Sequence, residues 1–351
     1  MFKTRYKKHI LDFRFTARTS RGAMQQKETF FIQIKDEQSG KVGFGECSTL
    51  KGLSIDAIPD YENHLIQILS LVEKCETSDE VLEIDELVDF PSIKFGLEIA
   101  LADLESDAQY QVFDTPFSNG QTGIPINGLI WMGDKDFMFE QIKAKLDSGF
   151  DCIKIKVGGI DFEEECSLMA YIRQHFSEDQ ITIRVDANGA FTPDNALEKL
   201  KRLSDYKLHS IEQPIKAGQI EQMSKLCELT PLDIALDEEL IGVKELEAKE
   251  LLLNQIKPQY IILKPSLVGG FISSEEWILL SEKREIGWWM TSALEANVGL
   301  NAIAQFTSKY NTKIPQGLGT GQLYHNNIGS PLEIKQGKLF YNKSLPWNPI
   351  F

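Results

Sequence analysis

Cysteine is scarce in this chain of 351 residues, and its few cysteines form no pattern. The five are odd in number, lie far apart and include no C-x-x-C pair: Cys47, Cys75, Cys152, Cys166 and Cys227. Zinc sites and thiol-redox sites usually show closely spaced cysteine pairs in the sequence. We therefore expect free thiols, and no activating group in the sequence marks one of them as a nucleophile.

Long apolar runs are absent and basic residues are in the minority. No stretch approaches the eighteen or so apolar residues of a membrane span, and the basic first ten residues lead into no apolar signal segment. The 37 Lys and Arg stand against 52 Asp and Glu, a formal charge of −15. Such a charge repels nucleic acid and anionic membranes. We expect a cytoplasmic protein without either partner, and the oligomeric state stays open.

What the chain has is a repeating pattern from about residue 120 onward. A short apolar, β-branched run is followed by a turn and then by an amphipathic stretch, which is typical of βα units. The expected strands are 124–130, 152–157, 181–188, 209–214, 232–238, 260–265, 287–292 and, more weakly, 313–321. The expected helices between them are 162–176, 192–203, 218–229, 243–253, 273–284 and 296–307.

Seven or eight parallel strands alternating with helices predict an α/β fold, a (β/α)7β-type TIM barrel over residues 116–322. An open doubly wound sheet is the alternative, and the barrel is favoured because polar residues recur at one end of many strands. Residues 1–115 read instead as strands followed by helices, which predicts an α+β module. A strand-like run in residues 323–351 is expected to return to that module.

Charged residues stand near the ends of consecutive expected strands. In chain order they are Lys154 and Lys156, Asp186, Glu212, Asp237 and Lys264, each step between strands being about one βα unit. Strand ends of a barrel share one mouth. Three carboxylates from adjacent strands supply hard oxygen ligands that suit Mg²⁺. A lone carboxylate there is more often a helix cap, but the series predicts a metal site.

The two lysines of "CIKIKV" (152–157) alternate with apolar residues. Because side chains alternate faces along a strand, Lys154 and Lys156 point the same way. An unpaired ammonium inside an apolar run is costly. The pair therefore indicates a function at the acidic centre rather than a solvated strand face.

Five segments, in the same order as the expected strands, carry a resemblance to a known family. "KIKVGG" (154–159), "RVDANGAF" (184–191), "IEQP" (211–214), "LDEEL" (236–240) and "LKPSLVGG" (263–270) resemble the muconate lactonizing enzyme subgroup of the enolase superfamily. The resemblance implies that the N-terminal module and the C-terminal tail form a capping domain. It also implies a small-molecule carboxylate substrate and Mg²⁺, with Mn²⁺ as an alternative ion.

The resemblance assigns roles to the charged residues. It makes Asp186, Glu212 and Asp237 the metal ligands, Lys156 the acid/base, Lys154 its companion and Lys264 the lysine on the opposite face of the substrate. Asn188 and Glu238 become supporting polar residues. The chemistry agrees, because a cation stabilises the enediolate that forms when a proton beside a carboxylate is removed. A neighbouring cation also favours the neutral amine that a lysine base requires.

The segments "TSALEANVGLNAIAQF" (291–306) and "GLGTG" (317–321) resemble the o-succinylbenzoate synthase family within that subgroup. This implies dehydration of 2-succinyl-6-hydroxy-2,4-cyclohexadiene-1-carboxylate in menaquinone synthesis, with Ser292, Gly319 and Thr320 near the substrate. Loops 19–26 and 48–54 are expected to cover the site. Arg21 or Lys51 could pair with the succinyl carboxylate, or be ordinary surface residues.

Other functions stay open at this point. Dipeptide epimerases usually carry D-x-D near the eighth strand, where this chain has "GLGTG", whereas an N-acylamino acid racemase needs only the two opposed lysines. A Schiff-base aldolase would use a lysine nucleophile but has no need of three carboxylates. A noncatalytic binding protein would be expected to have lost a ligand or a lysine, and none is missing.

Overall fold

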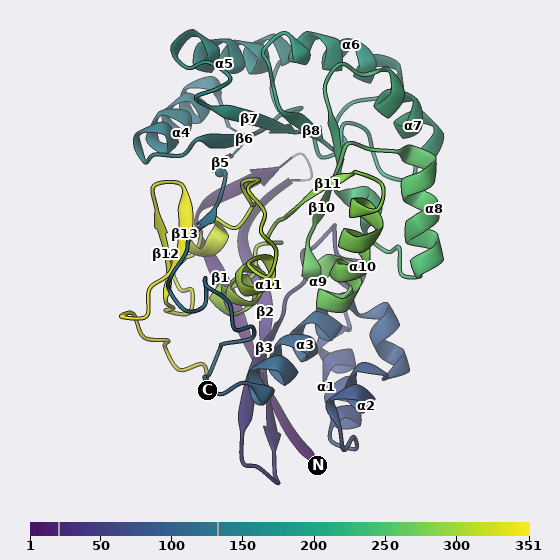
Figure 1. Ribbon diagram of the computed structural model, residues 1–351, viewed down its shortest axis with the longest axis vertical. Coiled ribbons are helices and arrows are strands. Elements are labelled where there is room, and N and C mark those ends of the chain that lie inside the picture. Colours follow the sequence, from purple (N-terminus) through teal and green to yellow (C-terminus); the bar gives the residue numbers. More distant parts are fainter. Residues whose placement is uncertain (20–21, 132) are drawn as a thin grey trace.

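The computed structural model describes residues 1–19, 22–131 and 133–351, and it confirms the predicted α/β barrel. Strands β1–β3 form one antiparallel sheet, β5–β11 form a seven-stranded sheet, and β4 pairs with β12 and β13. Figure 1 shows the long β1–β2 hairpin running from the N-terminus toward the barrel strands.

Arg21, a predicted substrate contact, lies outside the described residues. No described helix is long and apolar enough to cross a membrane.

The cap sheet is built on that hairpin. Strand β1 (Phe2–Thr19) pairs antiparallel with β2 (Gly22–Asp36), with a register shift between Asp12 and Ala17, and β2 pairs with β3 (Val42–Cys47). Residues 19 and 22–26 belong to these two strands, so the described part of segment 19–26 is strand rather than the expected loop. Phe15 of β1 and Met24 of β2 thereby reach the mouth of the barrel.

Helices cover one side of the cap sheet. They are α1 (Tyr61–Val72), α2 (Ser78–Leu82) and α3 (Pro91–Glu105), with the 3-10 turn η1 (Asp85–Asp89) before α3. Helix α3 packs so closely on β3 that a Cβ on Gly43 would lie 1.9 Å from the carbonyl oxygen of Ala100. A Cβ on Gly45 would lie 2.0 Å from that of Gly96. Only glycine permits this approach.

The barrel strands follow one another in parallel around the sheet. They are β5 (Gly128–Ile130), β6 (Cys152–Lys156), β7 (Thr182–Asp186), β8 (Ser210–Glu212), β9 (Ile234–Leu236), β10 (Tyr260–Leu263) and β11 (Gly287–Met290). The strand expected at 313–321 forms only single bridges, from Gln316 to Ile126 and from Gly317 to Thr291. These bridges fill the eighth position. The run expected at 124–130 divides into β4 (Ile124–Pro125) and β5.

The six expected barrel helices are all present, with two additions, one at 135–147 and a short one at 265–268. They are α4 (Lys135–Asp147), α5 (Phe162–His175), α6 (Pro193–Ser204), α7 (Ile220–Leu229), α8 (Leu246–Ile256), α9 (Pro265–Val268), α10 (Gly270–Glu282) and α11 (Asn297–Thr307). Helix α4 was not expected. Met138, Phe139, Ile142 and Leu146 of this helix stand at helical spacing and pack on the core, so the pattern is present in the sequence and was missed.

The core explains the direction of the site residues. On β6 the side chains of Ile153 and Ile155 are fully buried and belong to the large core cluster that includes residues of the outer helices. The alternate residues therefore face the barrel interior. There a smaller cluster contains Ala235, Ile262 and Trp289. The inner face is thus part apolar core and part functional site.

The tail does not simply return to the cap. Its hairpin, β12 (Leu332–Lys335) and β13 (Lys338–Tyr341), adds to β4 rather than to the cap sheet. Contact with the cap comes from the flanking segments: Tyr324 bridges Phe13, and the Lys7 ammonium donates to the carbonyl of Ile350 at 2.6 Å. The domain boundaries at 115 and 322 stay a prediction.

Candidate active site

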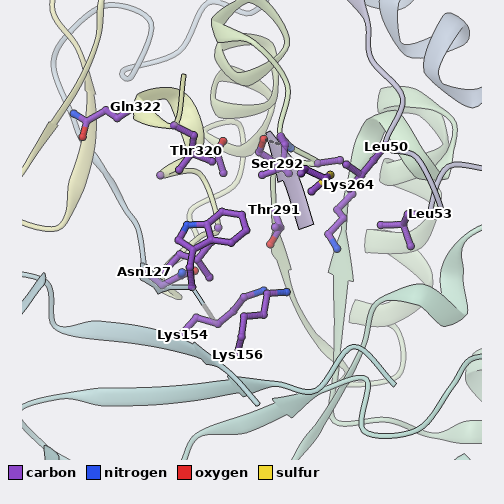
Figure 2. Close-up of a pocket in the computed structure, with 18 of the residues that line it drawn as sticks. Leu50, Leu53, Asn127, Lys154, Lys156, Lys264, Thr291, Ser292, Thr320 and Gln322 are labelled. Carbon is purple, nitrogen blue, oxygen red and sulfur yellow. Dashed lines mark hydrogen bonds between the residues drawn. The ribbon is translucent and has the colours of Figure 1, made fainter. Parts of the chain in front are cut away.

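A cavity of about 630 Å³ opens where the barrel strands end and the cap hairpin arrives. The cap contributes mainly apolar side chains, among them Phe15, Met24, Leu50 and Leu53. The barrel contributes Lys154, Lys156, Lys264, Thr291 and Ser292. Figure 2 shows Lys154 and Lys156 together on one wall and Lys264 pointing toward them from another. A molecule in this cavity would lie among three amines.

Three buried carboxylates from β7, β8 and the end of β9 stand against these amines. Strand register places Lys156 beside Asp186 and Asp186 beside Glu212. The ammonium of Lys156 lies 2.6 Å from Oδ2 of Asp186, and that of Lys154 lies 2.6 Å from Oε2 of Glu212 and 3.1 Å from Oδ2 of Asp186. Lys264 pairs with Asp237. The six residues therefore form one buried charge cluster.

The charge cluster shifts the pKa values of its members in opposite directions. Burial, together with the nearby carboxylates of Asp186 and Asp237, raises the pKa of Glu212 to about 8. Burial also opposes ionisation of Asp186, but Lys156 and Lys154 outweigh it and hold the pKa of Asp186 well below its usual range. Burial disfavours the charge on Lys154, yet Glu212 and Asp186 together raise its pKa. The amine of Lys154 is therefore held in its charged form.

The implied divalent cation can be tested against these residues. In the described residues, no three His, Cys, Asp or Glu side chains are grouped closely enough to hold a metal as they stand. The lysine ammonium groups instead neutralise the carboxylates. Oε1 of Glu212 is nevertheless buried with no hydrogen-bond partner among the described residues. Burial, together with the carboxylates of Asp186 and Asp237, raises the pKa of Glu212. Hard oxygen donors in that state fit a divalent cation.

Comparison with known proteins places the chain in a family. Residues 138–343 match the family model described as "Enolase C-terminal domain-like". The o-succinylbenzoate synthase of Desulfotalea psychrophila is 45% identical, over 95% of this chain and 97% of that protein. The chain belongs to the o-succinylbenzoate synthase family of the enolase superfamily. It is accordingly an enzyme, a carbon–oxygen lyase by family.

Solved structures give the same result for the fold of this o-succinylbenzoate synthase family member. The crystal structure of MenC from Desulfotalea psychrophila matches with a TM-score of 0.84 and 43% identity, covering 97% of this chain and 99% of that one.

The N-succinylamino acid racemase of an Amycolatopsis species is a more distant relative in sequence, 25% identical over 92% of this chain and 87% of that protein.

The supporting residues predicted from the motifs lie beside the charge cluster of this family member. Oδ1 of Asn188 accepts a hydrogen bond from the Lys156 ammonium at 2.7 Å, and Nδ2 donates to Oε1 of Glu238 at 3.1 Å. The backbone N–H of Asn188 donates to Oδ1 of Asp186 at 3.0 Å. Asn188 therefore links the acid/base candidate to two acidic side chains.

The predicted substrate contacts line the cavity, with different hydrogen-bonding states. Lys51, Ser292, Gly319 and Thr320 are all in its wall. The Ser292 hydroxyl donates to Oε2 of Glu295 at 2.5 Å, so its proton is already in use. The hydroxyl of Thr320 is buried and has no partner in the described part of the chain. It is thus better placed than Ser292 to donate to a bound molecule.

Sequence reasoning missed two buried carboxylates behind this wall, one of which joins the cap to the barrel. Glu295 accepts from the hydroxyl groups of Ser266 and Ser292, each at 2.5 Å. Glu46, on β3, accepts from the backbone N–H groups of Ala296 and Gly299 at 2.7 and 2.8 Å and so caps α11 from the other module. The only signal in the sequence is an acidic residue inside an apolar segment.

Proposed function

We propose that this chain is an o-succinylbenzoate synthase, which dehydrates 2-succinyl-6-hydroxy-2,4-cyclohexadiene-1-carboxylate to 2-succinylbenzoate in menaquinone synthesis. The observation that carries the proposal is the placement of Lys156 and Lys264 on different walls of one cavity, beside three buried carboxylates. The relative from Desulfotalea psychrophila, which bears that name and aligns over nearly the whole chain, supports it.

The lysines would carry the proton transfers. Lys156 takes the proton on the ring carbon that bears the carboxylate, and the electron pair of that C–H bond enters the ring. The bond from ring carbon to hydroxyl then breaks, and the same proton, returned by Lys156, lets the hydroxyl leave as water. Lys264 stabilises the negative charge of the dienediolate from the other side. Formation of the aromatic ring makes the elimination favourable.

The three carboxylates would serve as a cation site. Asp186, Glu212 and Asp237 are the residues that would hold Mg²⁺ or Mn²⁺. The bound ion supplies positive charge for the carboxylate oxygens of the substrate when the enediolate forms. The lysines and Asn188 remain the groups that move and orient the proton.

The rest of the substrate would lie against the cap. The apolar wall of Phe15, Met24, Leu50 and Leu53 suits a hydrocarbon ring. Lys51 is exposed at the edge of the cavity and is a candidate partner for the succinyl carboxylate. Arg21 remains a second candidate from the sequence. In the described part of the lining there is no Asp or Glu, which disfavours substrates with a free ammonium group.

The test follows the absorbance of the cyclohexadiene substrate after purified protein is added in the presence of Mg²⁺. Dehydration of the substrate is measured as the loss of that absorbance. We expect turnover with parent protein, and its loss after chelation of the metal or in Lys156→Ala. Lys201→Ala, which removes an exposed lysine on α6, is the matched control and should turn over like the parent. A parent protein that binds Mg²⁺ but shows no turnover would rule the proposal out.

Racemisation of N-acylamino acids is the second candidate function. Two lysines on different walls suit removal of a proton on one face and its return on the other, and the Amycolatopsis relative bears the name of such an enzyme. Circular dichroism of an N-succinylamino acid incubated with the protein would detect it. Racemisation without dehydration would make this the function in place of the synthase.

A further inference from the structure

Gln213 is a buried residue with an unusual backbone, directly after the candidate metal ligand Glu212. Its side chain is fully buried and its φ is +39°, in the left-handed region that non-glycine residues rarely adopt. Holding such a conformation costs free energy, so the surrounding contacts must favour it. Those contacts are specific.

The carboxamide of Gln213 uses its whole hydrogen-bonding capacity. Its Oε1 accepts from the backbone N–H groups of Asp237 at 3.1 Å and Glu239 at 3.3 Å. Its Nε2 donates to the carbonyl of Ile215 at 3.0 Å and to Oε2 of Glu239 at 3.0 Å. Two donors and two acceptor lone pairs on one planar group are available only from a primary amide. No acidic or apolar side chain could replace all four bonds.

The backbone of Gln213 makes two more links. Its N–H donates to the carbonyl of Ala235 on β9 at 2.9 Å, and its carbonyl accepts from the N–H of Gly189, in the turn after β7, at 2.7 Å. One residue therefore contacts the ends of β7, β8 and β9. These are the three places that present Asp186, Glu212 and Asp237.

We propose that Gln213 is a positioning residue that fixes the three carboxylates relative to one another for divalent cation binding. It touches neither the cavity nor any of the three carboxylates, so it acts through the backbone of Asp237 and through the turns. The inference rests on the metal site of the proposed function. It adds the residue that sets the geometry of that site.

The test compares two buried glutamines. Gln213→Met keeps the volume and removes the four side-chain bonds. Gln305→Met is the control, because Gln305 on α11 is equally buried and its amide bonds the carbonyl of Tyr110 at 2.8 Å, Oδ1 of Asn301 at 2.9 Å and the N–H of Phe113 at 2.9 Å. Both variants lose buried hydrogen bonds, but only the first lies at the strand ends.

The readout is the Kd of Mn²⁺ measured by electron paramagnetic resonance, without substrate. We expect Gln213→Met to bind Mn²⁺ about 10 to 100 times more weakly than the parent, which is the usual effect of removing an outer-shell partner. Gln305→Met should bind like the parent. Equal Kd values for Gln213→Met and the parent, or equal weakening in both variants, would overturn the inference.

If Gln213→Met does not fold, a milder variant tests whether these hydrogen bonds affect Mn²⁺ binding. Glu239→Met removes the Oε2 acceptor, one of the four partners. A Kd more than about threefold weaker would support the inference, whereas an unchanged Kd would overturn it. The proposed function is judged separately. If the parent binds Mn²⁺ but does not dehydrate the substrate, the synthase proposal fails while the Kd comparison still stands, and if the parent binds no Mn²⁺, this inference fails.

Discussion

At the scale of single residues, the site is a set of buried ion pairs between lysines and carboxylates. For the carboxylates to bind a cation, the lysine ammonium groups would have to leave them. Lys264 is 8% exposed and neutralises Asp237, so its ammonium competes with any cation for that carboxylate. We predict that Lys264→Met lowers kcat by about 100-fold or more, because it removes the charge that would stabilise the dienediolate. We also predict that Mn²⁺ binds to this variant no more weakly than to the parent. Turnover and Mn²⁺ titration check both, and turnover within tenfold of the parent would contradict the role of Lys264.

At the scale of elements, α3 of the cap is joined to α10 of the barrel by Glu98, which accepts from the backbone N–H of Phe271 at the first turn of α10. Burial, only partly offset by that N–H group and by Lys94, raises the pKa of Glu98 to about 7. The folded protein thus binds this proton more tightly than the unfolded chain does, so the contribution of Glu98 to stability is greatest below the usual pKa of about 4.5. It is lost as the pH rises toward 7.

The matching substitution is Glu98→Gln, which keeps an acceptor for Phe271 and carries no charge. We predict that its free energy of unfolding, relative to the parent, increases by about 2 kcal/mol between pH 5 and pH 8. Urea unfolding at both values measures this. Glu86→Gln, in the 3-10 turn η1 at the exposed surface, is the control and should show no such trend. A constant difference between Glu98→Gln and the parent across this range would contradict the assignment.

At the scale of the whole molecule, the candidate cation site joins three strands of one barrel, so a bound ion should stabilise the folded chain as a unit. A ligand at 100 times its Kd that binds only the folded state adds about 2.7 kcal/mol. We predict that saturating Mg²⁺ raises Tm by about 2 to 5 °C. Because the net charge of −15 would respond to any salt, the controls are NaCl at equal ionic strength and Glu212→Gln in Mg²⁺. The same rise in the controls would attribute the effect to screening alone.

Much of this protein could be predicted from local pattern. The βα period predicted the barrel, because a strand buried on both faces needs a continuous apolar run and its helix needs an apolar stripe. The same period predicted that six charged residues lie at or near the ends of adjacent strands, and the structure has them there. They are Lys154, Lys156, Asp186, Glu212, Asp237 and Lys264. Helix α4 was missed although its apolar residues stand at helical spacing.

Other features were decided only by tertiary structure. Whether β12 and β13 pair with the cap sheet or with β4 depends on which strand edge is available to them after folding. The sequence of the hairpin does not indicate which of the two it will pair with. The partners of Gln213 and Glu295 are set by strand ends and helix ends that meet only after folding. Sequence alone therefore determined which charges reach the mouth of the barrel, since strand periodicity is local. Which charge pairs with which, and what holds them there, depended on contacts between distant segments.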